Sequence, residues 1–234
     1  MSFKSKVDYF GLAKEGAVVV VSANEGKSAQ TVEAAGQDGS IVASEVFGET
    51  MAPSCDYKLK AAMEFTEQAP LKIGDVMTVD EKKFVRTNVS ISTGAGSEPT
   101  VSASGAQVND DAATGCYYAI PAFKLLTKHH AQILFSAFEL TGDGCHLTGA
   151  NYTLSANLAK ATKEGVCLAF DVTNGRIEAQ VTVKQCGTAA PTLTPGDGWK
   201  ITAPLTESNP DSDYPTFTAT LVKYLAKSDA AETP

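Results

Sequence analysis

Three long stretches of the chain alternate apolar and polar side chains residue by residue. They are Cys55–Phe65, Arg176–Lys184 and Pro215–Leu225. In the second stretch the apolar set is Ile177, Ala179, Val181 and Val183. Because successive side chains of a strand point to opposite faces of its sheet, this pattern predicts antiparallel strands with one buried face. The expected fold class is therefore all-β, an antiparallel β-sandwich or barrel.

Shorter runs of β-branched or alternating residues predict further strands. They cover residues 17–23, 28–34, 40–47, 76–79, 84–92, 147–159, 166–173 and 199–203. Two connections contain the pairs Asp38-Gly39 and Asn174-Gly175. Such pairs supply the positive φ that a tight turn requires. We therefore expect one hairpin around Asp38-Gly39 and a second around Asn174-Gly175.

One or two short helices are expected beside the strands. Residues 3–14 place Val7 and Phe10 on one side of a possible helix. Thr127–Phe138 places His130, Ile133, Leu134 and Ala137 at helical spacing.

The sequence is expected to form a single β-rich domain over residues 1–225, followed by a small polar tail at 226–234 that we expect to be flexible. Residues 93–115 are rich in Gly, Ser, Ala and Thr and predict a long loop, with room for a short strand at Thr100–Ser104. Loops of this length are often functional. Ordering by a partner and simple flexibility both stay open.

A weak two-fold repeat spans the middle of the chain. Val85, Val89, Ile91 and Pro99-Thr-Val101 recur 92 positions later as Ile177, Val181, Val183 and Pro191-Thr-Leu193. Duplication and independent strand–turn patterning explain it equally well.

The formal charge of −8, with Arg86 and Arg176 as the only arginines, disfavours a nucleic-acid binder. The acidity fits ordinary solubility, and it also fits a surface that nucleic acid passes without binding.

The five cysteines have no CxxC spacing, and an odd number argues against a closed disulfide framework or a zinc site. We expect free thiols in a reducing compartment, with Cys55 and Cys167 buried in strands. The first apolar run, Ala17–Val21, is too short for a signal segment or a membrane span. These features predict no membrane association.

No motif predicts a catalytic, cofactor-binding or metal site. On a helix, His129 and His130 point about 100° apart, which hinders a shared metal. Cys145 and His146 would face opposite sides of a strand, so their adjacency gives no nucleophile–base pair. The third histidine, His146, reaches a metal with His130 only if the fold happens to bring them together.

The remaining polar candidates are equally weak. Asp211-Ser-Asp213 resembles half of a calcium loop but lacks its terminal Glu, so an Asx turn is expected instead. Asp110-Asp111 and Asp143 form no evident acid–base pair. Trp199 could stack on a sugar, although a lone Trp at the start of a strand is more often part of the core.

Three further segments have a recognisable pattern: the Asp38-Gly39-Ser-Ile-Val-Ala-Ser-Glu run leading to Phe47-Gly48, the segment Pro99-Thr-Val-Ser-Ala-Ser-Gly105, and the polar lead-in Ser208–Asp213 to the last strand. These segments resemble those of bacteriophage virion proteins, most of all tail-tube or major tail proteins.

The resemblance implies a non-enzymatic subunit of the virion, made in the host bacterial cytoplasm. Rings of the subunit, usually hexameric, would stack into a hollow tube and contact other virion proteins. Inner strands of neighbouring subunits would join into one barrel around DNA that passes without specific binding. Loops and termini would clamp the next ring, and residues 93–115 are the expected arm.

The alternative hypothesis is a β-sandwich binding module, such as a capsid decoration, adhesin or carbohydrate-binding domain. An enzyme ranks third, because it would need a convergent polar cluster. On the first hypothesis, deletion of residues 94–114 should spare the fold and abolish polymerisation.

Overall fold

The computed structural model describes residues 18–24, 26–59, 72–79, 82–94, 99–109, 117–119, 135–163, 166–209, 211 and 214–228. Within these ranges the fold is all-β, as the alternation predicted, and contains no helix. The strands are β1 Val18–Asn24, β2 Lys27–Ala35, β3 Ile41–Met51, β4 Ser54–Leu59, β5 Lys72–Ile73, β6 Val76–Val79, β7 Lys82–Gly94, β8 Thr100–Gln107, β9 Tyr117–Ala119, β10 Phe138–Thr141, β11 Cys145–Lys163, β12 Val166–Gln185, β13 Thr192–Pro195, β14 Lys200–Glu207, β15 Thr216–Tyr224 and β16 Lys227–Ser228.

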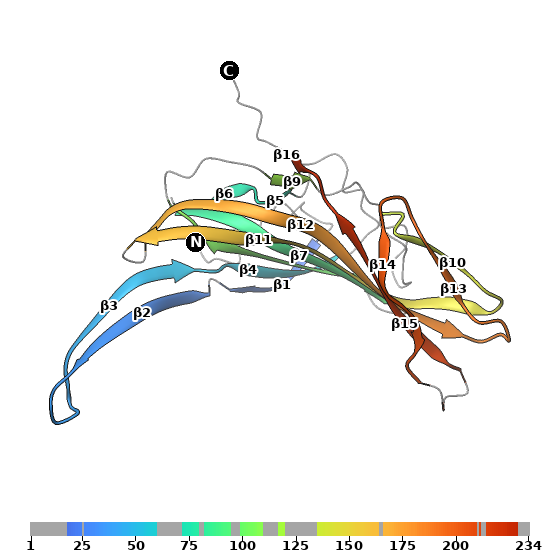
Figure 1. Cartoon of the computed structure of the whole chain (residues 1–234), viewed down its shortest axis with the longest axis horizontal. Helices are drawn as coiled ribbons and strands as arrows, with labels where there is room; N and C mark the ends of the chain where they lie inside the picture. The colour runs from blue at the N-terminus through green and yellow to red at the C-terminus, as the bar shows by residue number, and fades with distance from the viewer. Residues whose placement is uncertain are drawn as a thin grey trace, which may run out of the picture.

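A nine-stranded antiparallel sheet forms the body of the molecule, in the order β1-β4-β8-β7-β11-β12-β15-β14, with β6 added on β7. Its strands arch along their length (Figure 1). Within the described ranges β1 pairs only with β4, and β14 only with β15. This sheet is therefore open and does not close into a barrel.

The convex face of the sheet carries the core. One row of directly paired residues crosses five strands and is buried throughout: Cys55, Ala103, Val89, Leu154 and Ile177. Ala103, Val89, Leu154 and Ile177 each lie two positions from another buried residue of their own strand, as period-two alternation requires. The predicted strands Arg176–Lys184 and Pro215–Leu225 thus bury the face that the sequence assigned to the core, while residues 60–65 of the predicted strand Cys55–Phe65 lie outside the described residues.

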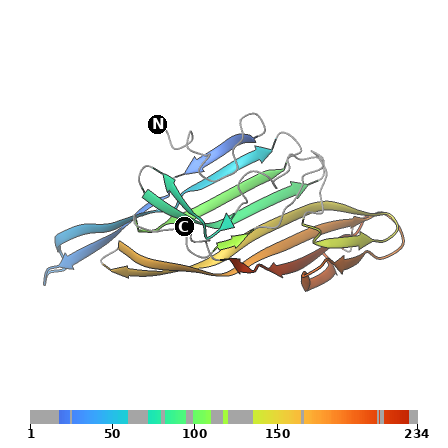
Figure 2. The same ribbon diagram turned by 90° about the horizontal axis from the view of Figure 1, so that it is seen from above.

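A small three-stranded sheet, β16-β9-β5, covers part of the convex face. It lies above the arch in Figure 1 and over the main sheet in Figure 2. Its Ile73 and Tyr118 are buried in the same core cluster as the main sheet. The β10–β13 and β2–β3 pairs form separate two-stranded sheets.

The Asp38-Gly39 turn is confirmed. Gly39 has φ of 80°, and the amide of Gly36 donates to the carbonyl of Ser40 at 2.7 Å. The hairpin expected at Asn174-Gly175 is wrong, because β12 continues through this pair. Asn174, with φ of 57°, and Gly175 together lie opposite the single residue Ala156, which is a β-bulge. A bulge uses the same positive φ as a turn, so the pair alone did not separate the two.

The long loop expected at residues 93–115 is wrong in its centre, whereas the short strand for which it left room at Thr100–Ser104 is present and extends to Gln107. Thr100–Gln107 is β8, which lies between β4 and β7 in the main sheet. Its small side chains permit close packing: a Cβ on Gly105 would lie 2.9 Å from the Val85 carbonyl oxygen. A strand built of small residues therefore has the composition of a loop. Residues 95–98 and 110–116 lie outside the described ranges.

Most residues of the two predicted helices and of the predicted tail lie outside the described ranges, so the structure tests these predictions only in part. Residues 3–14 and 127–134 lie outside the described residues. The expected helix cannot include Phe135–Phe138, because Phe135 and Ser136 have positive φ and Phe138 begins β10. The tail expected to be flexible begins with β16, which pairs with β9, while residues 229–234 lie outside the described part.

The two blocks of the weak repeat differ in their pairing. After β7, Pro99-Thr-Val101 leads into β8, which pairs back onto β7. After β12, Pro191-Thr-Leu193 leads into β13, which pairs with β10 instead. The similarity of the two segments therefore does not extend to strand pairing.

Candidate assembly surfaces

The concave face of the main sheet is mostly polar, although its rows also contain Val19, Ala203 and the buried Val222. Alternation places there the side chains that face away from the core, and directly paired residues form rows across the strands. The first row is Ser22, Asp56, Ser102, Ser90, Thr153, Glu178, Val222 and Lys200. The flanking rows are Asn24, Ser54, Ser104, Asn88, Ser155, Arg176 and Tyr224, and Val19, Lys58, Thr100, Ser92, Asn151, Gln180, Thr220 and Ala203. Hydroxyl and amide groups dominate this surface, which we call the polar face.

Charges on the polar face nearly cancel. Its three rows contain the acids Asp56 and Glu178 and the bases Lys58, Arg176 and Lys200. The chain's net charge of −8 is therefore not concentrated on this surface.

Asp56 ties the edge strand β1 to its neighbours. The Ser22 hydroxyl on β1 donates to the Asp56 carboxylate at 2.5 Å. Hydrogen bonds from Ser102 on β8 and from Ser22 hold the pKa of Asp56 below its usual value, because they favour the ionised carboxylate.

The two open edges of the main sheet differ. β14 contains Pro204, which has no N–H to donate, and its pairing with β15 shifts register twice. β1 has one register shift, between Val20 and Ser22, and the intervening Val21 is exposed. Irregularities of this kind limit indiscriminate edge-to-edge pairing, yet backbone groups of both edges stay available to a specific partner.

The β2–β3 hairpin projects beyond the body of the molecule (Figures 1 and 2). It continues the line of β1 and β4, and the Ala52 amide closes its base by donating to the Gly26 carbonyl at 3.1 Å. Four of its large apolar side chains are mostly exposed: Val32 (55%), Ile41 (59%), Val42 (66%) and Val46 (60%).

Both faces of this hairpin are apolar in part. The pair Thr31↔Val46 points to one face, and the next pair, Val32↔Glu45, points to the other. An isolated two-stranded hairpin is at best marginally stable in water. Exposed valines on both faces are characteristic of a surface that another molecule covers.

A second two-stranded extension lies at the same end of the molecule (Figure 2). β7 pairs with β11 only at 149–155, and β15 pairs with β12 only at 176–184. Beyond the bulge, residues 157–163 and 166–173 pair with one another, and we call them the β11–β12 ribbon. Its Val172 is buried, whereas Leu168 is 58% exposed.

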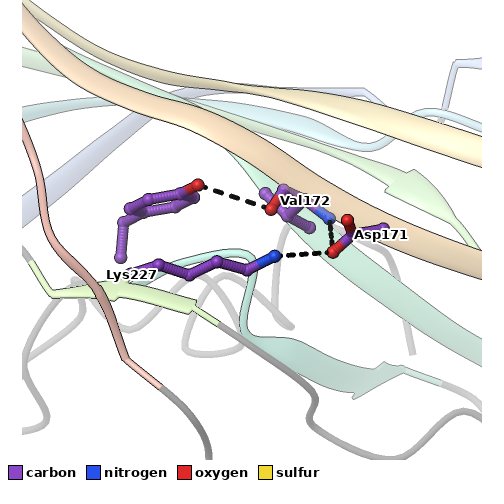
Figure 3. Close-up of polar contacts among 4 residues, drawn as sticks. Asp171, Val172 and Lys227 are labelled. Carbon is purple, nitrogen blue, oxygen red and sulfur yellow. Dashed lines mark hydrogen bonds and ion pairs between the residues drawn. The ribbon is translucent and has the colours of Figure 1, made fainter.

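The C-terminal segment fixes the base of this ribbon. Lys227 of β16 forms an ion pair with Asp171 at 2.9 Å, and the Tyr118 hydroxyl of β9 donates to the Val172 carbonyl at 3.5 Å (Figure 3). The hydrogen bond from Lys227 holds the pKa of Asp171 below its usual value. A Cβ on Gly175 would lie 2.1 Å from the Tyr118 ring, so the bulge needs glycine for the small sheet to dock.

Of the cysteine and histidine candidates for chemistry, the structure describes Cys145 and His146. Cys145 is half-buried and His146 is exposed at the start of β11. Burial raises the pKa of the Cys145 thiol, and Asp143 and Cys186 raise it further. A raised pKa disfavours the thiolate, which is the opposite of what a nucleophile needs. His129 and His130 lie outside the described residues.

The acidic candidates that the structure describes, Asp143 and Asp211, are both exposed. Asp110, Asp111 and Asp213 lie outside the described residues. Cys55 and Cys167 are buried as expected, and Trp199 is also buried, which agrees with its interpretation as a core residue.

Among the described residues, no three His, Cys, Asp or Glu side chains gather closely enough to hold a metal ion. The same ranges contain no helix with the length and hydropathy needed to cross a membrane. No protein-family model and no curated protein matches the chain.

The exposed valines of the hairpin were not identified as functional from the sequence. The available signal was the apolar content on both faces of a predicted two-stranded unit. Within residues 28–47, Val32 pairs with Glu45 and Val46 pairs with Thr31, so the two valines point to opposite faces of the hairpin. That pattern gives no single buried face.

Proposed function

We propose that this chain is a non-enzymatic structural subunit of a bacteriophage particle that self-assembles into the stacked rings of a tail tube. The observation that carries the proposal is the β2–β3 hairpin, whose exposed valines on both faces need a covering partner. A second copy of the chain is the simplest partner that a self-assembling subunit provides.

The open sheet supports ring formation. Copies arranged head to tail would bring the β1 edge of one subunit beside the β14 edge of the next, and such heterologous contacts close into rings when the rotation permits. Main-chain hydrogen bonds at the joint would extend the sheet from copy to copy.

The polar face supports a lumenal role. In such a ring, the concave surfaces of all copies would face the channel. A surface of hydroxyl and amide groups with nearly balanced charge lacks the cluster of Lys and Arg that holds phosphates. DNA would therefore pass it without being retained.

The test is negative-stain electron microscopy of concentrated protein, with light scattering on the same sample. We expect rings or hollow tubes for the unmodified chain. The matched variant Val46→Asp should stay monomeric with an unchanged melting temperature. A protein that stays monomeric at every concentration contradicts the proposal.

One observation favours a binding module as the second candidate. Tyr224 is exposed on the polar face directly opposite Arg176, and an aromatic ring among hydroxyl and amide groups suits a sugar ligand. Binding of a glycan that is lost in Tyr224→Ala, by a protein that never assembles, would support this function instead.

A further inference from the structure

The strand pairing, exposed apolar residues and charges of the β2–β3 hairpin and the β11–β12 ribbon indicate which surface of a second copy the hairpin contacts. We propose that the β2–β3 hairpin of one copy docks on the β11–β12 ribbon of a neighbouring copy. This inference rests on the proposed self-assembly and names the contact that mediates it.

Neither extension pairs with a third strand within the described part of the chain, although the Val172 carbonyl at the base of the ribbon accepts a hydrogen bond from the Tyr118 hydroxyl. β2 and β3 pair only with each other, and so do residues 157–163 and 166–173 of the ribbon. Each therefore offers free strand edges, and pairing between two such edges satisfies backbone groups on both sides.

Both extensions also expose apolar surface at one end of the molecule. Ile41 and Val46 share one face of the hairpin, and Leu168 is the exposed large apolar residue of the ribbon. Exposed alanines, Ala159, Ala161 and Ala169, surround Leu168 on paired positions of the ribbon and leave room for larger side chains from a partner. Contact between the two would remove apolar surface of both from water.

The charges of the two extensions are opposite. Residues 31–46 of the hairpin contain three acids, Glu33, Asp38 and Glu45, and no Lys or Arg. Residues 157–173 of the ribbon contain Lys160, Lys163, Glu164 and Asp171, and the ion pair from Lys227 neutralises Asp171, so this extension together with Lys227 has a net charge of +1. The hairpin would be repelled by a second hairpin and attracted by a ribbon, which selects the ribbon as its partner.

Charge reversal tests this contact on the full-length chain. The hairpin-reversed variant is Glu33→Lys/Glu45→Lys, and the ribbon-reversed variant is Lys160→Glu/Lys163→Glu. Lys163→Glu alone is a second ribbon variant, because the Lys160 ammonium donates to the Gln107 carbonyl at 2.5 Å and that contact should be spared. The control is Glu139→Lys, an exposed acid on β10, which belongs neither to the two extensions nor to the β1 and β14 edges of the main sheet.

The readout is the protein concentration at which light scattering detects assembly, with melting temperatures recorded for every variant. We expect each reversed variant to need about tenfold more protein than the unmodified chain, or more, because like charges then meet. Mixing the two reversed variants, or combining all four substitutions in one chain, should restore assembly to near the original concentration. Glu139→Lys should change little.

The proposal is overturned if neither reversal changes assembly, or if the mixture and the combined variant fail to recover it. In both cases an unmodified chain that still assembles leaves the proposed function standing. An unmodified chain that never assembles contradicts the proposed function and this contact together.

Discussion

Val181 and Val46 are the same residue in antiparallel strands, yet Val181 is 1% exposed and Val46 is 60% exposed. Val181 lies on β12, which pairs with β11 on one side and β15 on the other. Val46 lies on β3, which pairs only with β2 in the described structure. Gln180, the residue before Val181, has the same two neighbouring strands but points to the opposite face and is exposed. The difference shows that neighbouring strands and the face of the sheet together, and not the apolar side chain itself, decide burial within one chain.

Introducing a charge at each of the two positions should give the largest difference in stability. Val181→Asp should unfold the protein, at a cost of about 4 kcal/mol or more, because it buries an unpaired carboxylate. Val46→Asp should change the free energy of unfolding by less than about 0.5 kcal/mol, as exposed substitutions usually do. Circular dichroism during thermal unfolding measures both, and a folded Val181→Asp protein would disprove the register of β12.

Deleting the β2–β3 hairpin and deleting the segment that contains β8 should have opposite effects on the fold. Replacing residues 28–50 with an Asn-Gly turn would join Lys27 to Met51, which are already paired, so the fold should survive while assembly is lost. Deleting residues 94–114 should unfold the protein, because the deletion removes β8 from between β4 and β7. This reverses the outcome expected from the sequence alone.

The two deletions are compared by near-ultraviolet circular dichroism and light scattering. A shortened hairpin that assembles normally would show that the exposed valines have no role in it. A folded protein after loss of 94–114 would contradict the central position of β8.

The close approach of the Tyr118 ring to Gly175 at the base of the ribbon provides a further test. Gly175→Ala should destabilise the protein by about 2 kcal/mol, because the added methyl group overlaps the Tyr118 ring. Gly149→Ala is the matched control, since its Cβ would meet no atom closer than 3.8 Å. Urea unfolding measures the difference, and equal stability of the two variants would mean that the small sheet does not dock on the bulge.

The smallest expected effect concerns Asp56 at the β1 edge. Its lowered pKa means that its stabilising hydrogen bonds are fully present above the unfolded pKa, near 4, and are lost as the pH falls through the lower folded pKa. Ser102→Ala should raise the pKa of Asp56 toward its ordinary value, while Ser90→Ala, in the next strand of the same row, should not. Carboxyl NMR titration tests this, and an unchanged pKa in Ser102→Ala would remove Ser102 as the cause.

Local pattern was enough to predict the all-β class and most of the strands. Alternation in 176–184 gave the correct buried face, because central strands of one sheet follow period two strictly. The Asp38-Gly39 turn was also predicted, because its neighbours on both sides are strands of matching length.

Predictions failed where local pattern permits two structures. Asn174-Gly175 suits both a turn and a bulge, and only the long partner strand β11 selects the bulge. Residues 100–107 have the small side chains of a loop, and only their neighbours β4 and β7 make them a strand. The candidate assembly surfaces depend on which strands lack neighbours, which is a property of the whole fold.

Amide hydrogen exchange of the hairpin tests the central claim most directly. The measurement compares residues 27–51 in dilute protein with the same residues at concentrations that give assemblies, using β12 as the internal reference. We expect fast exchange in the dilute protein and strong protection on assembly, while β12 is protected in both. A hairpin that is already protected in the dilute monomer, or that stays unprotected in assembled protein, would contradict the account.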